Sequence, residues 1–350
     1  MLVPRLSRSL AALTAGAMVL AMTLAACGGS SGGGGGSGGK KTVKVGLAYD
    51  IGGRGDKSFN DAAYAGLERV RNELNFQTKD LSAKANEPDS DKEERLRLLA
   101  GSGYNPVIAV GFAYAAPLAK VAKDYPGTKF ALIDGEVPGA ANVRGLTFAA
   151  EQGSFLVGAA AALKSKTRTV GFVGGCSVPL IATFEAGYLA GVKAVDERVK
   201  VLSHYLSSTA QGCSGFHDPA AGKTTATGMY EGGADIVYHA AGGSGDGVFQ
   251  AAKAQGKLAI GVDRDQYLTA DPAVRDVILT SMLKQVDVAV LDFAKAIAED
   301  RFQAGTKNYD LKANGVGYST SGGKVDDIKA QLDAYRQQIV DGKITVPTKP

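Results

Sequence analysis

KVGLAYD at residues 44–50 and TVGFVGG at residues 169–175 decide the fold class of this 350-residue chain. Each stretch is a short apolar run that contains β-branched residues. Each is followed by a glycine-containing loop and then by a longer segment of helical pattern. The same order of strand, loop and helix recurs many times from residue 42 onward. This rhythm is typical of α/β proteins with parallel sheets.

The two stretches also begin an internal repeat. In each copy a phenylalanine follows the valine of the strand by fourteen residues, and a glycine follows that phenylalanine by seven. The repeat predicts that the two phenylalanines stand at equivalent helix starts, although the general similarity of strand–loop–helix units is an alternative explanation. The residues concerned are Val45, Phe59 and Gly66 in the first copy and Val170, Phe184 and Gly191 in the second.

The pattern predicts ten strands with helices between them. Ten strands exceed what one doubly wound domain usually holds, so we expect two such lobes. The strands are expected at residues 42–49, 75–80, 106–110, 129–133, 143–148, 169–173, 199–207, 235–239, 258–262 and 277–281. The helices are expected at residues 60–75, 91–101, 155–164, 183–196, 248–254 and 286–301.

The first residues of the chain carry an export signal. Arg5 and Arg8 precede an uncharged apolar run at residues 10–26, which is too short and too rich in small residues for a good membrane span. The run ends in LAAC, which resembles the bacterial lipobox. We therefore expect residues 1–26 to be a signal peptide and Cys27 to carry lipid. An ordinary cleavable signal beside a chance cysteine is the alternative.

The segment after Cys27 is suited to a tether. Residues 28–39 are only glycine and serine, a composition that behaves as a flexible coil. We expect residues 27–41 to hold a folded body near the extracytoplasmic face of the cell membrane.

Composition narrows the function classes further. Apolar residues make up 45% of the chain and charged residues 21%, which is ordinary for a soluble globular body, and the net charge is +4. No basic block with aromatic residues suggests a nucleic-acid partner. With Cys27 assigned to lipid, Cys176 and Cys213 remain in an oxidising compartment, and we predict a disulfide between them. Two unpaired, buried thiols are the alternative.

Three carboxylates end predicted strands, where ligands bind in open parallel sheets. They are Asp50, Asp134 and Asp263. Each alone is more often a cap or turn residue. Together with Phe59 and Phe184 they suggest a site for a flat ring between the two lobes, although either phenylalanine considered singly fits a core position equally well.

Two loops beside these positions add candidate groups. DKSFN at residues 56–60 surrounds Phe59 with polar side chains, of which Asn60 suits either a helix cap or a contact to a ring edge. AGGSGDG at residues 241–247 offers backbone N–H groups, including that of Gly243, to an incoming ligand.

Catalytic patterns fit poorly, so we expect no enzyme, no metal and no cofactor. The tripeptide GKT at residues 222–224 lacks the phosphate-loop glycine, because His217 stands in its place. The histidines have no metal-ligand spacing, and no Gly-x-Ser-x-Gly elbow occurs.

An ordered set of segments runs through the body: GLAYD at 46–50, DKSFN at 56–60, GFVGG at 171–175 followed by Pro179, FEAG at 184–187, AAGGSG at 240–245, GVDRDQ at 261–266 and TSMLK at 280–284. Taken in order, these segments are similar to the basic membrane protein family of substrate-binding lipoproteins, which includes the purine nucleoside receptors of bacterial import systems. The resemblance covers the body from about residue 43 to residue 346.

The resemblance implies a type I periplasmic binding protein, with two doubly wound, Rossmann-like lobes joined by three crossovers. We place the crossovers near Ala149, Asp271 and Asn314. The N-terminal lobe would contain residues 42–149 and 272–314, and the C-terminal lobe residues 150–271 and 315–350. The lobes would close over a nucleoside, with a purine expected, and present it to the permease of an ABC importer. We expect the protein to act as a monomer.

The resemblance also implies roles for individual residues. Phe59 and Phe184 would sandwich the base, Asn60 and Asp134 would contact its edge, Asp263 with Lys284 would hold the ribose, and Asp50 and Gly243 would line the same cleft. The Cys176 and Cys213 pair is not associated with the family as a whole.

Three other functions stay open at this point. A receptor for a sugar or another small polar metabolite could use the carboxylates without a base. A ligand-sensing lipoprotein would use the same fold to signal to a membrane partner. A nucleoside-processing enzyme would convert its bound ligand, whereas a receptor would release it unchanged.

Overall fold

The computed structural model describes residues 43–84 and 87–350. The predicted signal peptide at residues 1–26, the lipid attachment at Cys27 and the tether at residues 27–41 lie outside the described residues. Within the described residues, none of the helices combines the length and the apolar character needed to cross a membrane.

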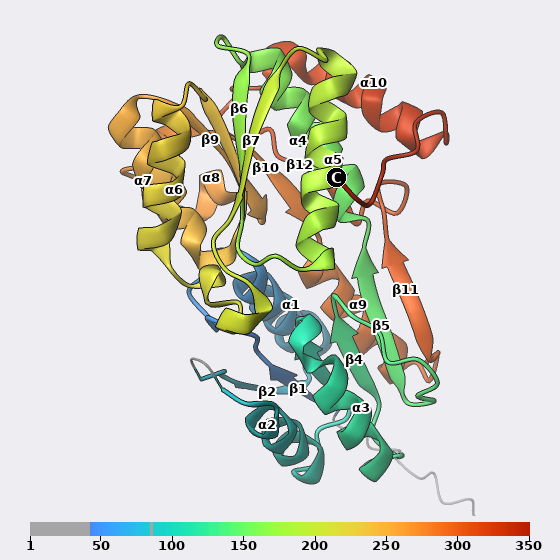
Figure 1. Cartoon of the computed structure of the whole chain (residues 1–350). Helices are drawn as coiled ribbons and strands as arrows, with labels where there is room; N and C mark the ends of the chain where they lie inside the picture. Colours follow the sequence, from blue (N-terminus) through green and yellow to red (C-terminus); the bar gives the residue numbers. More distant parts are fainter. Residues whose placement is uncertain (1–42, 85–86) are drawn as a thin grey trace, which may run out of the picture. The chain divides into compact units, whose positions relative to one another are not determined.

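The first sheet is entirely parallel and has six strands in the order β11-β5-β4-β3-β1-β2. Five of its strands come from the first part of the body, and the sixth returns from near the C-terminus (Figure 1). The strands are β1 (Lys44–Ala48), β2 (Gln77–Leu81), β3 (Val107–Val110), β4 (Phe130–Ile133), β5 (Val143–Phe148) and β11 (Gly305–Tyr309).

The second sheet also has six strands, in the order β12-β10-β9-β8-β6-β7. All neighbours are parallel except β12, which pairs with β10 in the antiparallel direction. The strands are β6 (Thr169–Gly174), β7 (Lys200–Tyr205), β8 (Ile236–Ala240), β9 (Leu258–Asp263), β10 (Ile278–Lys284) and β12 (Val316–Tyr318).

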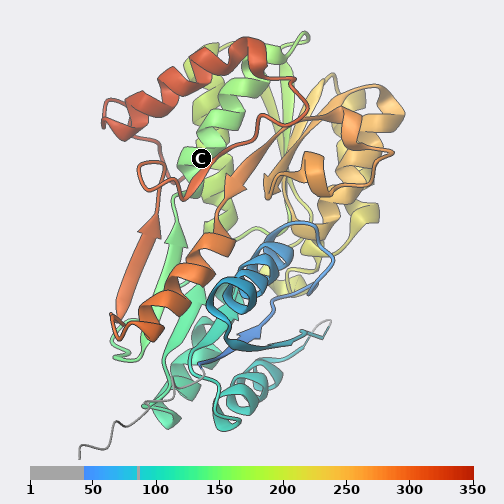
Figure 2. The same ribbon diagram turned by 180° about the vertical axis from the view of Figure 1, so that it is seen from behind.

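Helices cover both faces of each sheet. Helices α1 and α9 pack against each other beside the first sheet, as Figure 2 shows from behind, and α2 packs with α3. In the second sheet α4 packs with α5 and α6 with α7, on opposite sides (Figure 1). The helices are α1 (Phe59–Leu74), α2 (Asp89–Gly101), α3 (Ala115–Asp124), α4 (Ala150–Lys164), α5 (Pro179–Val195), α6 (Pro219–Glu231), α7 (Gly245–Gln255), α8 (Gln266–Thr269), α9 (Val286–Ala298) and α10 (Lys329–Val340).

The continuous apolar strands follow from this layering, because successive side chains of a strand point to opposite faces and both faces are covered. In β3, Ile108 belongs to the core beneath α1 and α9, whereas Val107 and Ala109 belong to the core beneath α2 and α3. All four residues of β3 and all four of β4 are buried.

The repeat glycines mark close helix crossings in both sheets. A Cβ on Gly66 of α1 would lie 2.8 Å from the backbone oxygen of Asp287 in α9. A Cβ on Gly191 of α5 would lie 2.0 Å from the backbone oxygen of Phe155 in α4. Glycine at these two places therefore allows the paired helices to approach.

Three connections link the two sheets. The chain passes from β5 to α4 at Ala149, from β10 to α9 at Gln285, and from β11 to β12 through residues 310–315. The second connection differs from the crossover predicted near Asp271. Since β10 pairs in parallel with β9, residues 278–284 belong to the second sheet, and the predicted N-terminal lobe wrongly includes them.

The predicted elements agree with the structure in type, although several of their ends differ by a few residues. Each of the ten expected strands and six expected helices has a counterpart. Sequence reasoning missed two strands, β11 and β12, and the helices α3, α6, α8 and α10.

Candidate functional site

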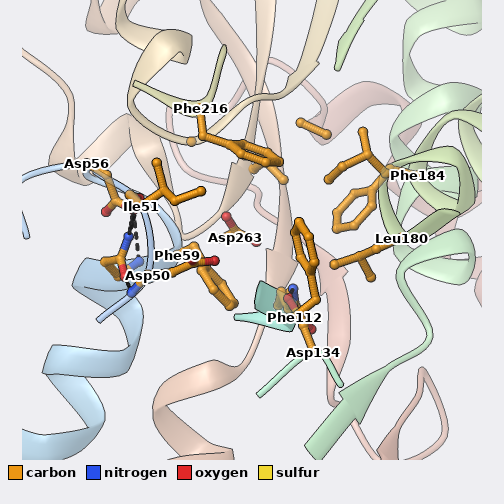
Figure 3. A pocket seen from close by; sticks show the side chains of 16 residues that line it. Asp50, Ile51, Asp56, Phe59, Phe112, Asp134, Leu180, Phe184, Phe216 and Asp263 are labelled. Atoms are coloured by element: carbon orange, nitrogen blue, oxygen red, sulfur yellow. Dashed lines mark hydrogen bonds and ion pairs between the residues drawn. The ribbon is translucent and has the colours of Figure 1, made fainter. Parts of the chain in front are cut away.

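A cavity of about 580 Å³, part of which is open to solvent, lies where the carboxyl ends of the two sheets face each other. Figure 3 shows side chains from both sheets pointing into it. The lining residues are Asp50, Ile51, Asp56, Phe59, Asn60, Phe112, Asp134, Leu180, Ile181, Phe184, Phe216, Ala240, Gly242, Val262, Asp263 and Lys284.

Seven of the eight ligand-binding residues expected from the sequence line this cavity. The exception is Gly243, which does not line the cavity. Its neighbour Gly242 does. The seven residues are Asp50, Phe59, Asn60, Asp134, Phe184, Asp263 and Lys284.

A buried ion pair joins the two sheets at the floor of the cavity. The ammonium of Lys284, at the end of β10, pairs with Oδ2 of Asp134, which follows β4. Both side chains are at most 4% exposed. The other carboxylate oxygen of Asp134 is buried and has no hydrogen-bond partner in the described part of the chain. This oxygen can accept a hydrogen bond from a ligand.

Aromatic rings surround the same ammonium. Nζ of Lys284 lies 4.6 Å from the ring centroid of Phe59, 5.2 Å from that of Phe148 and 5.5 Å from that of Phe184. Ring faces attract a cation at these distances, so the rings help to hold the ammonium in place.

Asp263, the last residue of β9, forms a second link between the sheets. Its carboxylate accepts a hydrogen bond from the hydroxyl of Ser58, which precedes α1. Burial raises the pKa of Asp263, and the nearby Lys284 partly opposes this rise. Asp134 and Asp263 both have positive φ, 62° and 64°, which aspartate tolerates better than most residues.

A third link lies closer to solvent. The ammonium of Lys57 lies 2.9 Å from Oδ2 of Asp246 in α7, and both side chains are about one-third exposed. The side-chain amide of Gln266 donates to the backbone oxygen of Lys57 at 3.3 Å. These contacts join the loop before α1 to the second sheet.

Asp56 organises the loop before α1. Its carboxylate accepts hydrogen bonds from the backbone N–H groups of Ser58, Asn60 and Asp61 at 3.0, 2.8 and 3.1 Å, which caps the first turn of the helix. It also accepts from the side-chain amide of Asn60 at 3.1 Å. Burial raises the pKa of Asp56 to about 6, although these hydrogen bonds oppose the rise.

The side chain of Asn60 is largely used within the protein. Its Oδ1 accepts from the backbone N–H of Asp50 at 3.1 Å, and its amide donates to Asp56 and, at 3.4 Å, to the backbone oxygen of Ile51. Asn60 therefore fixes the loop that follows β1.

The carboxylate of Asp50 lies against Gly111, the residue that follows β3. A Cβ at position 111 would lie 1.9 Å from Oδ2 of Asp50, and Gly111 has a φ of 96°, so both space and backbone conformation require glycine. Burial raises the pKa of Asp50 to about 7. Its Oδ1 is buried and has no partner among the described residues.

We expect Asp50→Asn to raise the free energy of unfolding. This gain should be larger at pH 8 than at pH 5, by at least about 1 kcal/mol. The folded state holds the Asp50 proton up to about pH 7, whereas the ordinary value is 3.8. The folded chain therefore binds more protons than the unfolded chain between these values, and its stability falls as the pH rises through them. Urea denaturation of parent and variant at both pH values measures the effect. A stability difference that does not change with pH would contradict it.

Four phenylalanines line the cavity. Phe59 and Phe112 lie in segments that follow strands of the first sheet, and Phe184 and Phe216 lie in segments that follow strands of the second. Figure 3 shows Phe216 above Phe59. The expected equivalence of Phe59 and Phe184 at helix starts is wrong. Phe59 is the first residue of α1, whereas Phe184 lies inside α5, which begins at Pro179 because proline suits the first helical position. Phe184 is only 3% exposed.

Sequence reasoning missed Phe112, Phe216 and Asp56. Phe112 follows β3 by two residues, so the rule that selected the strand-end carboxylates could have found it. Asp56 lies in the DKSFN segment at residues 56–60, but nothing in the sequence pattern predicts that its carboxylate caps α1. Phe216 lies in a 3-10 turn (Ser214–Phe216) after the long segment that follows β7, and no local signal points to it.

Cys176 and Cys213 form a disulfide, as expected from the sequence. Cys176 follows β6 by two residues, and Cys213 directly precedes the turn that carries Phe216. The bridge is thus closer to Phe216 in the chain than to Phe184.

The site offers hydrogen-bond acceptors, one cation and aromatic surface.

Burial lowers the pKa of the nearby His239 to about 4, so this imidazole is neutral at pH 7. Its Nε2 lies 3.1 Å from Oε1 of Gln266. Within residues 43–84 and 87–350, no group of His, Cys, Asp and Glu side chains is arranged to hold a metal ion.

Comparison with known proteins agrees with this arrangement. The family described as "ABC transporter substrate-binding protein PnrA-like" matches residues 42–349. The CD4+ T-cell-stimulating antigen of Listeria monocytogenes is 36% identical over 93% of this chain and 95% of its own length. The ABC transporter nucleoside-binding protein BmpA of Lactococcus lactis is 33% identical over 97% of this chain and 98% of its own length.

Solved structures share the fold. An ABC transporter solute-binding protein from Aeropyrum pernix superposes with a TM-score of 0.75 at 30% identity, over 87% of this chain and 93% of that one. A solute-binding protein from Conexibacter woesei, at 23% identity, has a TM-score of 0.70 over 87% and 99% of the two chains and shows the fold alone. The expected type I periplasmic binding protein fold is confirmed.

These findings also confirm that the chain is a solute-binding component of an ABC transporter and not an enzyme. The match spans nearly the whole body, and the strand-end cavity between the sheets is where such a protein would hold its solute. The chain belongs to the Bmp family of PnrA-like ABC transporter substrate-binding proteins.

Proposed function

We propose that the chain captures a nucleoside, with a purine nucleoside as the expected ligand, in the cavity between its two sheets and delivers it to the permease of an ABC importer. The observation that carries this proposal is the set of four phenylalanines from both sheets beside strand-end carboxylates. A flat, apolar ring with polar edges matches such a lining. The nucleoside-binding name of the Lactococcus relative supports the same ligand class.

The base would stack on Phe59 of the first sheet and on aromatic surface from the second. Phe184 and Phe216 both line the cavity, but Phe184 is almost fully buried whereas Phe216 is half-buried. Phe216 therefore offers more ring surface to a ligand. In this arrangement Phe184 mainly supports the ammonium of Lys284.

The polar groups would bind the edges of the ligand. Asp50 and Asp134 each have a buried carboxylate oxygen without a partner in the described chain, and such oxygens accept hydrogen bonds from N–H or hydroxyl groups. Asp263 and Lys284 would hold the ribose hydroxyls. Asn60 is engaged with Asp50 and Asp56, so its role would be mainly to fix their positions.

Capture follows from contacts to both sheets. A ligand that touches Phe59 on one side and Asp263 on the other has higher affinity for the arrangement in which the two sheets face each other closely. The links Lys284–Asp134 and Ser58–Asp263 would add to this arrangement. No bond of the ligand needs to form or break.

Recovery of the natural ligand tests the function directly. The purified body should release a nucleoside on denaturation, detected by mass spectrometry, and titration calorimetry of ligand-free protein should rank adenosine or guanosine above uridine and far above ribose. Release of a sugar, or tighter binding of ribose than of any nucleoside, would instead support a sugar receptor. Recovery of a converted nucleoside would support an enzyme.

Phe59→Ala should weaken nucleoside binding by about 1–3 kcal/mol, roughly 5- to 150-fold, because one stacking face is lost. Titration calorimetry with adenosine and guanosine measures this change. Phe302→Ala serves as a matched control, since Phe302 is half-buried and does not line the cavity. Equal affinity of parent and Phe59→Ala would remove Phe59 as a stacking face.

The N-terminal segment would keep this receptor at the membrane. After removal of residues 1–26, lipid on Cys27 would anchor the body at the extracytoplasmic face, and residues 28–39 would give it freedom to reach the permease. Such tethering raises the effective concentration of receptor at its partner, so a monomer with a weak docking contact would suffice.

Replacing the lipidated residue tests the anchor. In the producing bacterium, Cys27→Ser should shift the protein from the membrane fraction to the soluble extracytoplasmic fraction. The parent should begin at Cys27 and carry the mass of the attached lipid. A parent protein that lacks this added mass would contradict lipidation.

A further inference from the structure

The segment that carries Phe216 is attached covalently to the end of a central strand. We name residues 213–217 the roof segment. Its first residue, Cys213, is bonded to Cys176, and the two Cα atoms are 5.1 Å apart. Cys176 directly follows Gly175, which hydrogen-bonds through its backbone N–H to Ala240 of β8. The bridge therefore attaches the roof segment to the core of the second sheet.

The ring of Phe216 rests on the backbone beside this bridge. A Cβ on Gly175 would lie 2.4 Å from Cδ1 and 2.6 Å from Cε1 of the ring, so the absence of a side chain at Gly175 creates the place where the ring lies. Gly242 is close on another side, since a Cβ there would lie 3.1 Å from the backbone oxygen of Phe216. The ring position thus depends on the distance between the roof segment and the end of β6.

Two serines complete the attachment of the roof segment at Gly215. Ser207 donates to the backbone oxygen of Gly175 at 2.7 Å and accepts from the N–H of Gly215 at 2.9 Å. Ser244 donates to the backbone oxygen of Gly215 at 2.7 Å. These bonds hold one point of the segment, and the disulfide holds the other.

The chain on both sides of the roof segment is open to solvent. Residues 209–212 and residues 217–220 are exposed, and the secondary structure between Ser207 and the start of α6 consists of a single-residue β-bridge from Ser208 to Ser177 and two short 3-10 turns. Exposed segments with few packed side chains have many accessible conformations. The covalent bond is the strongest restraint on where Phe216 can lie.

We propose that the Cys176–Cys213 disulfide is a positioning device for ligand binding, which holds Phe216 in place as a wall of the cavity before the ligand arrives. This inference rests on the proposed function, in which Phe216 contacts the captured nucleoside. Without the bridge the roof segment samples more conformations, and the ligand must order it on binding. Preorganised groups bind more tightly because this ordering has already taken place.

Removal of the bridge should weaken binding only through Phe216. The experiment compares four proteins by titration calorimetry with adenosine and guanosine: the parent, Cys176→Ser/Cys213→Ser, Phe216→Ala, and the triple variant. In the parent background, loss of the bridge should lower the affinity about three- to tenfold. In the Phe216→Ala background, loss of the bridge should change the affinity less than twofold. Circular dichroism confirms that each protein is folded at the titration temperature.

Reduction of the parent provides a second route if the serine variant folds poorly. Treatment with tris(2-carboxyethyl)phosphine should lower the affinity of the parent by the same factor and should leave Phe216→Ala unchanged. Equal affinity with and without the bridge would overturn the inference. An equal loss in both backgrounds would overturn it as well, because the bridge would then act through other residues. A parent that binds no nucleoside would instead overturn the proposed function on which the inference rests.

Discussion

Lys284→Met should lower the free energy of unfolding by about 3–5 kcal/mol, the usual effect of removing one partner from a buried ion pair. The ammonium is the direct partner of Asp134, and it also favours the ionised form of Asp263. Methionine has similar length and fills the space among the rings of Phe59 and Phe184. The loss therefore comes from the uncompensated carboxylates and not from a cavity. Urea denaturation at pH 7 measures it.

A second substitution separates this charge effect from ligand binding. Lys284→Met/Asp134→Asn should recover most of the lost stability, because asparagine removes the unpaired charge and tolerates the φ of 62° at this position. The double variant should nevertheless bind nucleoside at least about tenfold more weakly, since the charged hydrogen bonds that Lys284 and Asp134 would make to the ligand are gone. If the free energy of unfolding of Lys284→Met alone lies within about 1 kcal/mol of that of the parent, water solvates Asp134 in the ligand-free protein and the prediction is wrong.

The strand-end carboxylates could be predicted from the sequence because two independent rules apply to them. An apolar run identifies a buried parallel strand, and the residue after such a strand lies at the edge where ligands bind. Asp50, Asp134 and Asp263 satisfy both rules and line one cavity. Their pairing with particular partners depends on how the two sheets face each other, which no local pattern encodes. The Lys284–Asp134 ion pair is of this kind.

The elements that escaped prediction have weak local signals. Strand β11 is an edge strand with the sequence GTKNY, in which only Tyr309 is buried, so it lacks the apolar run of a central strand. Helix α6 contains two glycines and three threonines, residues that favour helix weakly, and α10 is mostly polar. Packing against neighbouring helices stabilises them in place of their own propensity, since α6 packs on α7 and α10 on α4.

The role of Phe216 shows a different limit. The internal repeat predicted a ligand contact at Phe184 because this residue follows its strand by the same number of residues as Phe59. The repeat spacing is instead explained by the close helix crossings at Gly66 and Gly191. Phe216 reaches the cavity through a turn whose position depends on a cross-link to a distant strand. Such a residue can be located only when the tertiary arrangement is known.

Cys176→Ser/Cys213→Ser should lower the free energy of unfolding by about 4 kcal/mol. The bridge closes a loop of 37 residues, and the chain-entropy relation gives this value for a loop of that length. Residues within the loop include the exposed 3-10 turn (Thr209–Gln211), whose capping hydrogen bonds, between Ser208 and Gln211, are local. Urea denaturation of the parent and the variant, followed by circular dichroism, measures the difference.

The reducing agent provides the matched control for this prediction. Tris(2-carboxyethyl)phosphine should destabilise the parent by a similar amount and should not affect the double serine variant, because that variant has no disulfide to reduce. If reduction leaves the parent within about 1 kcal/mol of its oxidised form, the noncovalent contacts of Ser207 and Ser244 to Gly215 hold the segment by themselves. A loss near 4 kcal/mol would show that the bridge contributes a large share of the stability of an ordinary domain, which is about 5–15 kcal/mol. The proposed export of the chain would place this bond in an oxidising compartment, where disulfides persist.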